Sequence, residues 1–234
     1  MRFETGGVTR MMTELESLAS EIGDEGLRGM VLDFLKRPKA ELKGGRLPLD
    51  ECPGGAYVHH AYEGGLLQHT VAVVRLVLTI CDLVEGVYGG EVDRDVVMAG
   101  ALLHDLMKCY SYTREGDGFR TSPLGERVDH LSLLVAELYR RGFPVDVIHA
   151  VAAHHGDQSP VKPKTLEALI LSVADLADSE LSRQTMRAAE YLVREATGRR
   201  WRFGSSEEVL EVLRIKAREG WEGLRHFDSN GETS

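Results

Sequence analysis

Five of the nine histidines and two aspartates occur along this chain in the order His, His-Asp, His, His-His, Asp. Imidazole nitrogen and carboxylate oxygen are the donors that suit borderline first-row metals such as Fe, Mn, Co, Ni and Zn. Seven such donors are enough to hold two divalent ions side by side, and two adjacent ions can clamp a phosphoryl group and supply hydroxide at neutral pH. The predicted metal ligands are His69, His104, Asp105, His130, His154, His155 and Asp175.

His104 and Asp105 are adjacent near the end of an apolar segment that we expect to stop near Lys108. Two such neighbours can converge on one ion, and the second carboxylate oxygen can bridge to another ion. Lys108 lies four residues after His104, a spacing that predicts one helical face for both side chains. A lysine there could neutralise a phosphate oxygen as negative charge builds up in a transition state. We therefore expect Asp105 and Lys108 to take part in catalysis.

Asp175 interrupts the apolar segment LEALILSVADLAD. A buried carboxylate is costly unless it is paired or bound to a metal, so this position favours a ligand role. A lone histidine on an apolar helix is more often a hydrogen-bonded core residue, and we interpret His149 and His226 in this way. For the seven residues together that interpretation is weak, because an unmetallated cluster would bury several polar groups without partners. We interpret Glu126, Asp129 and Asp146 as exposed carboxylates or helix-start anions.

The composition of the chain narrows the classes of protein to consider. A length of 234 residues fits one large domain, and a formal net charge of −9 disfavours a passive nucleic-acid coating protein. The three cysteines lack CxxC spacing, which fits a reducing cytoplasm better than a disulfide framework. The start of the chain has no apolar core of secretory length. The longest apolar stretch, 71–84, is too short to span a bilayer. We expect a soluble cytoplasmic protein that does not bind membranes.

Helical periodicity dominates the elements that must position these residues. We expect an all-α fold with one possible small β-hairpin near 110–121. Thr13 with Glu16, and Ser205 with Glu208, have the spacing of capping boxes, whereas Asp24, Asp93 and Thr165 are expected to begin other helices. A loop is expected over 43–56. The predicted helices cover about 13–23, 24–37, 65–84, 93–108, 126–141, 144–154, 165–181, 184–197 and 207–225.

The order H…HD…H…HH…D resembles the HD superfamily of metal-dependent phosphohydrolases. The stretches HHAYEGGLLQHT, ALLHDLMK and AHHGDQSPVKPKTLEALILSVADLAD are most similar to the HD domains of bacterial 3′-to-5′ exoribonucleases. The resemblance covers residues 50–181. The signature of the HD-GYP phosphodiesterases is missing. The resemblance implies one HD-type helical domain over 1–234, with N-terminal helices and a loop at 1–55, the HD core at 56–181 and C-terminal helices at 182–234.

The resemblance also implies roles for individual residues. His69, His104, Asp105 and Asp175 match the ligands of a first metal. Lys108 matches a lysine that contacts substrate phosphate or a bridging hydroxide, and His59 and His60 belong to an element beside the active site, where they could contact substrate. His130, His154 and His155 match the ligands of a second metal, and Asp105 would bind both metals.

The leading hypothesis is a metal-dependent phosphohydrolase that cleaves a phosphoester of a nucleotide or short oligonucleotide. The RNA-processing relatives carry an OB-type domain before the HD domain, whereas the fifty residues here predict helices and a loop rather than strands. Exoribonuclease action remains an alternative, and no extended nucleic-acid surface is evident. Two further alternatives are a single-metal nucleotidase that uses only the first ligand set and a non-hydrolysing module that binds a nucleotide. The chain could also form a homo-oligomer.

Overall fold

The computed structural model describes residues 5–38, 40, 45–57, 59–225 and 227, so His226 lies outside the described residues. Helices and a single antiparallel hairpin make up its regular structure, which confirms the predicted fold class. The elements in chain order are α1 (Thr5–Ala19), α2 (Glu25–Lys36), α3 (Gly65–Gly86), α4 (Arg94–Leu103), α5 (Lys108–Ser111), β1 (Tyr112–Glu115), β2 (Gly118–Thr121), α6 (His130–Arg141), α7 (Val145–Ala152), η1 (Gly156–Gln158), α8 (Leu166–Thr197) and α9 (Ser206–Leu224).

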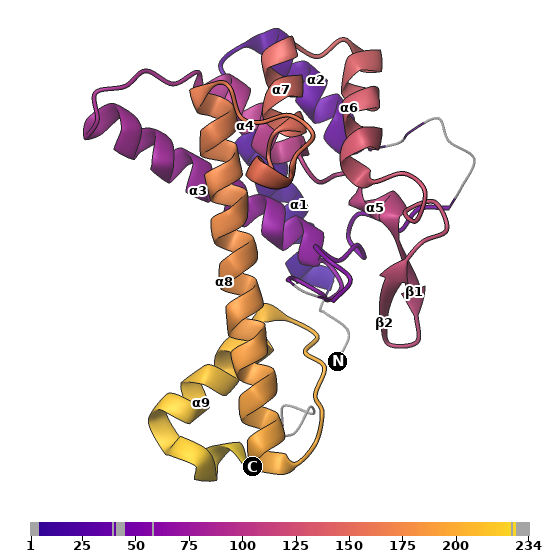
Figure 1. Cartoon of the computed structure of the whole chain (residues 1–234), viewed down its shortest axis with the longest axis vertical. Helices are drawn as coiled ribbons and strands as arrows, with labels where there is room; N and C mark the ends of the chain where they lie inside the picture. The colour runs from indigo at the N-terminus through magenta and orange to yellow at the C-terminus, as the bar shows by residue number, and fades with distance from the viewer. Residues whose placement is uncertain (1–4, 39, 41–44, 58, 226, 228–234) are drawn as a thin grey trace.

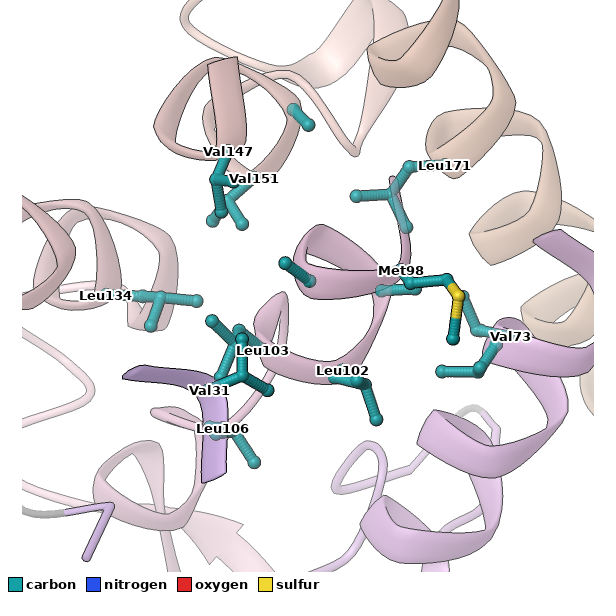
Figure 2. Close-up of a cluster of buried hydrophobic side chains, with 14 of the residues drawn as sticks. Val31, Val73, Met98, Leu102, Leu103, Leu106, Leu134, Val147, Val151 and Leu171 are labelled. Atoms are coloured by element: carbon teal, nitrogen blue, oxygen red, sulfur yellow. The ribbon is translucent and has the colours of Figure 1, made fainter. Parts of the chain in front are cut away.

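Helix α4 lies at the centre of the larger part of the molecule, where α1, α2, α3, α7 and α8 pack against it (Figure 1). Leu102 and Leu103 at its end are fully buried. Figure 2 shows side chains from α2, α3, α6, α7 and α8 around them. Each buried aliphatic side chain of this kind contributes about 1.5–3 kcal/mol relative to an exposed one. This core therefore fixes the ends of the helices that carry the predicted ligands.

Helix α8 is long enough to pack against two parts of the molecule (Figure 1). Its first half packs against α3, α4 and α7, and its second half packs against α9. A second apolar cluster joins α8 and α9 and includes Met186, Ala189 and Val193 from α8 and Val209 and Val212 from α9. The helices predicted at 165–181 and 184–197 are therefore one helix. No glycine or proline interrupts the sequence between them, and the apolar face continues across the expected break.

Several helices begin where their capping residues predict. The side chains of Asp24, Asp93, Asp129, Thr165 and Ser205 each accept a hydrogen bond from the backbone N–H three residues further along. Such caps satisfy donors that the first turn of a helix leaves free. The cap at Asp129 also shows why α6 begins at His130 and not at 126, where the sequence predicted its start.

Two predicted helix boundaries are wrong in an informative way. Helix α1 begins at Thr5 and passes through Thr13, because Met11 and Met12 already pack against the core before the expected cap. Helix α4 ends at Leu103 and does not reach Lys108. The Nδ1–H of His104 donates to the carbonyl oxygen of Ala101 at 2.8 Å, and a continuing helix would use that oxygen for the next backbone N–H.

Helix α3, which was predicted over 65–84, has 22 residues and therefore extends beyond the apolar stretch 71–84. By length and composition alone it could cross a membrane, but 50% of its most apolar window is buried inside the protein. It packs against α1, α4 and α8. We therefore interpret α3 as a core helix whose burial arises from its neighbours.

Candidate metal centre

The fold brings all seven predicted ligands to one place. His69 comes from the first turns of α3, and His104 and Asp105 follow the end of α4. His130 is the first residue of α6, and Asp175 lies within α8. His154 and His155, which follow the end of α7, complete the set.

The first group of donors consists of His69, His104, Asp105 and Asp175. One ligand atom from each lies within 4.8 Å of the others, and all four residues are buried. The Nε2 atom of His69 lies 3.1 Å from Nε2 of His104, 3.3 Å from Oδ2 of Asp105 and 3.2 Å from Oδ1 of Asp175. Two imidazole nitrogens and two carboxylate oxygens thus converge on one point, as the first-metal set requires.

The second group consists of Asp105, His130, His154 and His155, whose ligand atoms satisfy the same distance limit. Here the other oxygen of Asp105 is used: its Oδ1 lies 3.2 Å from Nε2 of His130 and 3.8 Å from Nε2 of His154. One carboxylate therefore faces both groups, with Oδ2 toward the first and Oδ1 toward the second. This geometry is what a ligand that bridges two cations would have.

Several atoms at the junction are buried without hydrogen bonds. Oδ1 of Asp105, Nε2 of His130 and Nε2 of His154 are inaccessible to solvent and donate to or accept from no described residue. Buried polar atoms are rarely left in this way, because each loses its hydration without compensation. Donor atoms that converge and lack partners fit a divalent cation by geometry and by chemistry.

The opposite ring nitrogens fix the orientation of three imidazoles. Nδ1 of His104 lies 2.8 Å from the carbonyl oxygen of Ala101, and Nδ1 of His154 lies 2.7 Å from that of Val151. A carbonyl oxygen only accepts, so Nδ1 carries the hydrogen and Nε2 offers its lone pair to the centre. In His69, Nδ1 lies 2.7 Å from Oδ2 of Asp178, so this nitrogen also carries a hydrogen and Nε2 is the one that faces the centre.

The electrostatics of the site favour a bound cation. Burial lowers the pKa of His104 and His154, so both imidazoles are neutral at neutral pH, as metal binding requires. Burial alone would raise the pKa of Asp105, but Lys108 and His104 lower it well below its usual range. His69 differs: burial would lower its pKa, yet the carboxylates around it raise the pKa well above the usual value. Carboxylates that attract a proton to this ring would also attract a divalent ion.

Lys108 lies beside the bridging carboxylate, with Nζ 2.5 Å from Oδ2 of Asp105. The two residues are three apart and are placed by a tight turn, since the N–H of Lys108 donates to the carbonyl oxygen of Asp105 at 2.8 Å. The prediction that one helix carries both His104 and Lys108 on the same face is therefore wrong. Lys108 reaches the site through the turn instead. Burial would lower the pKa of Lys108, but Asp105 raises it, so the ammonium stays charged.

A cavity of about 720 Å³ opens beside the two donor groups. Its lining includes the buried Lys108 and Asp175, the half-buried His59 and His155, and the exposed Leu169 and Leu176 of α8. Burial lowers the pKa of His59 to about 3, so that its imidazole is neutral. Lys108 and His59 thus line the cavity, and the contact of each with substrate stays a prediction.

His60 lies elsewhere, and this placement does not support its predicted contact with substrate. Its ring is buried behind His69, with Nε2 2.8 Å from Oδ2 of Asp178 and Nδ1 2.8 Å from the hydroxyl of Tyr62. It lines a separate, smaller cavity of about 230 Å³. Neighbouring residues in a loop can point in opposite directions, and the sequence did not distinguish His59 from His60.

Sequence reasoning missed Asp178. This carboxylate is buried and accepts from both His60 and His69. Burial would raise its pKa, but these two hydrogen bonds lower the pKa well below its usual value. The signal was present in the sequence, because Asp178 follows Asp175 by three residues in an apolar helix and so shares its face.

The fold and the two donor groups define a class of protein, the helical metal-dependent phosphohydrolases. The family model described as the HD domain matches residues 66–180. Dihydroneopterin 2′,3′-cyclic phosphate phosphodiesterase of Methanocaldococcus jannaschii is 43% identical over 212 residues, which cover 89% of this chain and 85% of the relative. The chain therefore belongs to the HD family and is a metal-dependent phosphohydrolase, as its motifs predicted.

More distant similarity links the chain to exoribonucleases, as the motifs also indicated. The 3′-5′ exoribonuclease YhaM of Bacillus subtilis is 26% identical over 191 residues, or 74% of this chain and 54% of the relative. YhaM of Listeria monocytogenes is 30% identical over 179 residues, or 71% and 55%. The chain thus spans about half the length of these exoribonucleases. No solved structure matches the chain.

Proposed function

We propose that this enzyme hydrolyses a 2′,3′-cyclic phosphodiester carried on a fused nitrogen heterocycle, the chemistry named for the M. jannaschii relative. Water would add across one P–O bond of the ring, which yields a phosphate monoester and one free hydroxyl group. The observation that carries this proposal is the pair of donor groups that share Asp105, beside a cavity that His154, His155 and Asp175 of these groups line.

We also propose that the centre holds two divalent first-row ions. The separate use of Oδ1 and Oδ2 of Asp105 supports two ions, because a single ion in the first group would leave His130, His154 and His155 without a role. Bound there, the ions would supply Lewis acidity toward the phosphoryl oxygens and lower the pKa of a nucleophilic water. Imidazole-rich donor sets suit Mn, Fe, Co, Ni or Zn better than Mg.

The residues of the chain have distinct tasks in this proposal. Lys108 lines the cavity, where its ammonium can donate hydrogen bonds to a phosphoryl oxygen as charge develops on that oxygen. Asp105 holds that ammonium in place. The neutral imidazole of His59 lines the same cavity, where we propose that it contacts the substrate.

Two exposed leucines in the cavity wall support the proposal of a heterocyclic substrate. The side chains of Leu169 and Leu176 are exposed to 51% and 66%, and both lie on the cavity wall. Exposed aliphatic groups beside a polar site offer a face on which a planar ring can lie. Gln158 and Ser172 on the same wall can bond the polar edge of such a ring.

The test combines metal analysis with a panel of substrates. Protein purified without chelator should contain nearly two first-row ions per chain. With Mn²⁺ or Fe²⁺ it should turn over dihydroneopterin 2′,3′-cyclic phosphate faster than nucleoside 2′,3′-cyclic phosphates, dinucleotides or short RNA. One ion per chain would contradict the two-metal proposal. Preferred turnover of RNA would favour the exoribonuclease alternative, which the YhaM similarity motivates.

A further inference from the structure

A buried chain of hydrogen bonds leads away from the metal centre toward the C-terminal helices. It begins at His69, whose Nδ1 donates to Oδ2 of Asp178 at 2.7 Å. The same oxygen lies 2.8 Å from Nε2 of His60. All three residues are buried. Because Asp178 holds a hydrogen of His69 on Nδ1, Nε2 is the ring nitrogen left to bind a cation at the donor group.

The chain continues through three more polar side chains to α9. Nδ1 of His60 lies 2.8 Å from the hydroxyl of Tyr62, and this hydroxyl donates to Oε1 of Gln68 at 2.5 Å. Nε2 of Gln68 donates to Oγ of Ser206, the first residue of α9, at 2.7 Å. Burial raises the pKa of Tyr62, so that its hydroxyl stays protonated. The single hydroxyl hydrogen of Tyr62 goes to Gln68, so the hydroxyl oxygen of Tyr62 accepts from Nδ1 of His60.

The backbone around His60 is built to hold this arrangement. His60 has a φ of 44°, a left-handed conformation that non-glycine residues rarely adopt. Its N–H donates to Oγ of Ser182 at 2.9 Å, and its carbonyl oxygen accepts from the N–H of Gly54 at 3.0 Å. A Cβ at Gly65 would collide with that carbonyl oxygen. Strained residues held by several contacts are typical of functional sites.

We propose that Asp178 and His60 are positioning residues, which set the orientation of His69 for metal binding. We infer further that Tyr62, Gln68 and Ser206 couple this orientation to the packing of α9 on α8. The inference rests on the proposed function, because it requires His69 to be a metal ligand. It assigns to α9 a role in the metal centre, although α9 supplies none of the seven predicted ligands.

The first test measures metal affinity rather than turnover. Asp178→Asn keeps the size of the side chain but offers His69 an amide, which can stabilise the wrong tautomer. Second-sphere changes of this kind typically weaken metal binding by about 10- to 100-fold. The readout is Mn²⁺ affinity of the metal-free full chain by chelator competition. Glu180→Gln, an exposed change on the same helix, is the matched control and should bind like the wild type.

The second test addresses the coupling to α9. Tyr62→Phe keeps the buried ring and removes only the hydroxyl, so it should weaken Mn²⁺ binding by several-fold. Ser206→Ala should weaken it less in the wild type and not at all in the Tyr62→Phe background, because the chain of bonds is already broken there. Glu211→Gln on α9 is the control. Equal effects of Ser206→Ala in both backgrounds would overturn the coupling.

The outcomes separate this inference from the proposed function. If the wild type binds no Mn²⁺, the proposed function fails as well. If the wild type binds and Asp178→Asn binds equally well, only the positioning role is overturned. Should Asp178→Asn not fold, Tyr62→Phe carries the test, and unchanged affinity in that variant contradicts the inference. The kinetic signature expected of folded variants is that excess Mn²⁺ restores kcat with KM unchanged.

Discussion

At the residue scale, Asp105 has the position on which both donor groups depend. Its Oδ2 faces His69 and His104, and its Oδ1 faces His130 and His154. Lys108 contacts the same carboxylate from the side of the cavity. A single buried side chain thus connects the two groups and the cation that can meet the substrate.

Replacement of the bridge should abolish activity and spare the fold. Loss of the Asp105 carboxylate would weaken both groups at once, so Asp105→Ala or His104→Ala should lower kcat by about 10³-fold or more, which corresponds to several kcal/mol of transition-state stabilisation. The helical circular-dichroism signal should persist. Asp146→Asn, an exposed change on α7, should leave the rate unchanged. Retained turnover by metal-loaded Asp105→Ala would count against the proposed mechanism.

Lys108 should affect the rate more than the metal content. Lys108→Met removes the ammonium and keeps the aliphatic length, so kcat should fall by about 10²-fold, as for the loss of one preorganised electrostatic donor. KM should change less, because the charge matters most as it develops on the phosphoryl oxygens. Elemental analysis should still find the wild-type amount of metal. A variant with full kcat would remove Lys108 from the proposed mechanism.

At the element scale, helix termini and turns deliver the ligands more than helix interiors do. His104 and His154 follow the last turns of α4 and α7, and each donates Nδ1–H to the carbonyl oxygen three residues earlier. His130 is the first residue of α6 and follows the cap at Asp129. The lengths and caps of these helices are therefore part of the site.

The cap at Asp129 gives a prediction with a definite pH dependence. Asp129→Ala should lower the free energy of unfolding by about 1 kcal/mol, the usual value for a lost N-cap. Burial would raise the pKa of Asp129, but hydrogen bonds from Ser132 lower it overall. The stabilisation by the ionised cap is therefore present above the unfolded pKa of about 3.9 and is lost as pH falls through the folded pKa.

Denaturant unfolding of wild type and Asp129→Ala at pH 7 and at pH 3 measures this difference. The gap between the two proteins should be larger at pH 7. A gap that grows on acidification would contradict the assignment of an ionised cap. Because His130 follows the cap directly, the variant should also bind the second ion more weakly, and the content of the first ion should be unaffected.

At the scale of the whole molecule, the metal centre joins helices that are far apart in the sequence. The predicted ligands come from α3 and α8 and from the ends of α4, α6 and α7, whereas α9 packs on the second half of α8 (Figure 1). Bound ions would therefore act as cross-links through the larger part of the molecule. The further inference extends this connection to α9.

Metal removal should destabilise the whole chain. A ligand that binds only the folded state adds RT ln(1 + [L]/Kd), about 2.7 kcal/mol when its concentration is 100 times Kd. Treatment with a chelator should therefore lower Tm, and added Mn²⁺ should restore it. Thermal unfolding followed by circular dichroism, with Mg²⁺ as the comparison ion, checks this expectation. Equal Tm values with and without chelator would mean that the centre does not hold metal in the folded protein.

The sequence by itself determined the helical class, most helix caps, and the types and order of the seven donors. Helix caps and helical periodicity depend on residues that are neighbours in the sequence, so they can be predicted from it. The residue types alone decide whether a donor is an imidazole, a carboxylate or a thiol. The resemblance to the HD family followed from the same ordered residues. These predictions needed no knowledge of how the helices pack.

Only the tertiary structure decided which side chains meet. It showed that Asp105 divides its two oxygens between the groups, that His60 turns away from the cavity, and that Asp178 contacts His69. It also made α8 one helix and placed Lys108 through a turn. The physical reason is that contacts between residues about 100 positions apart depend on helix packing, to which many buried side chains contribute together.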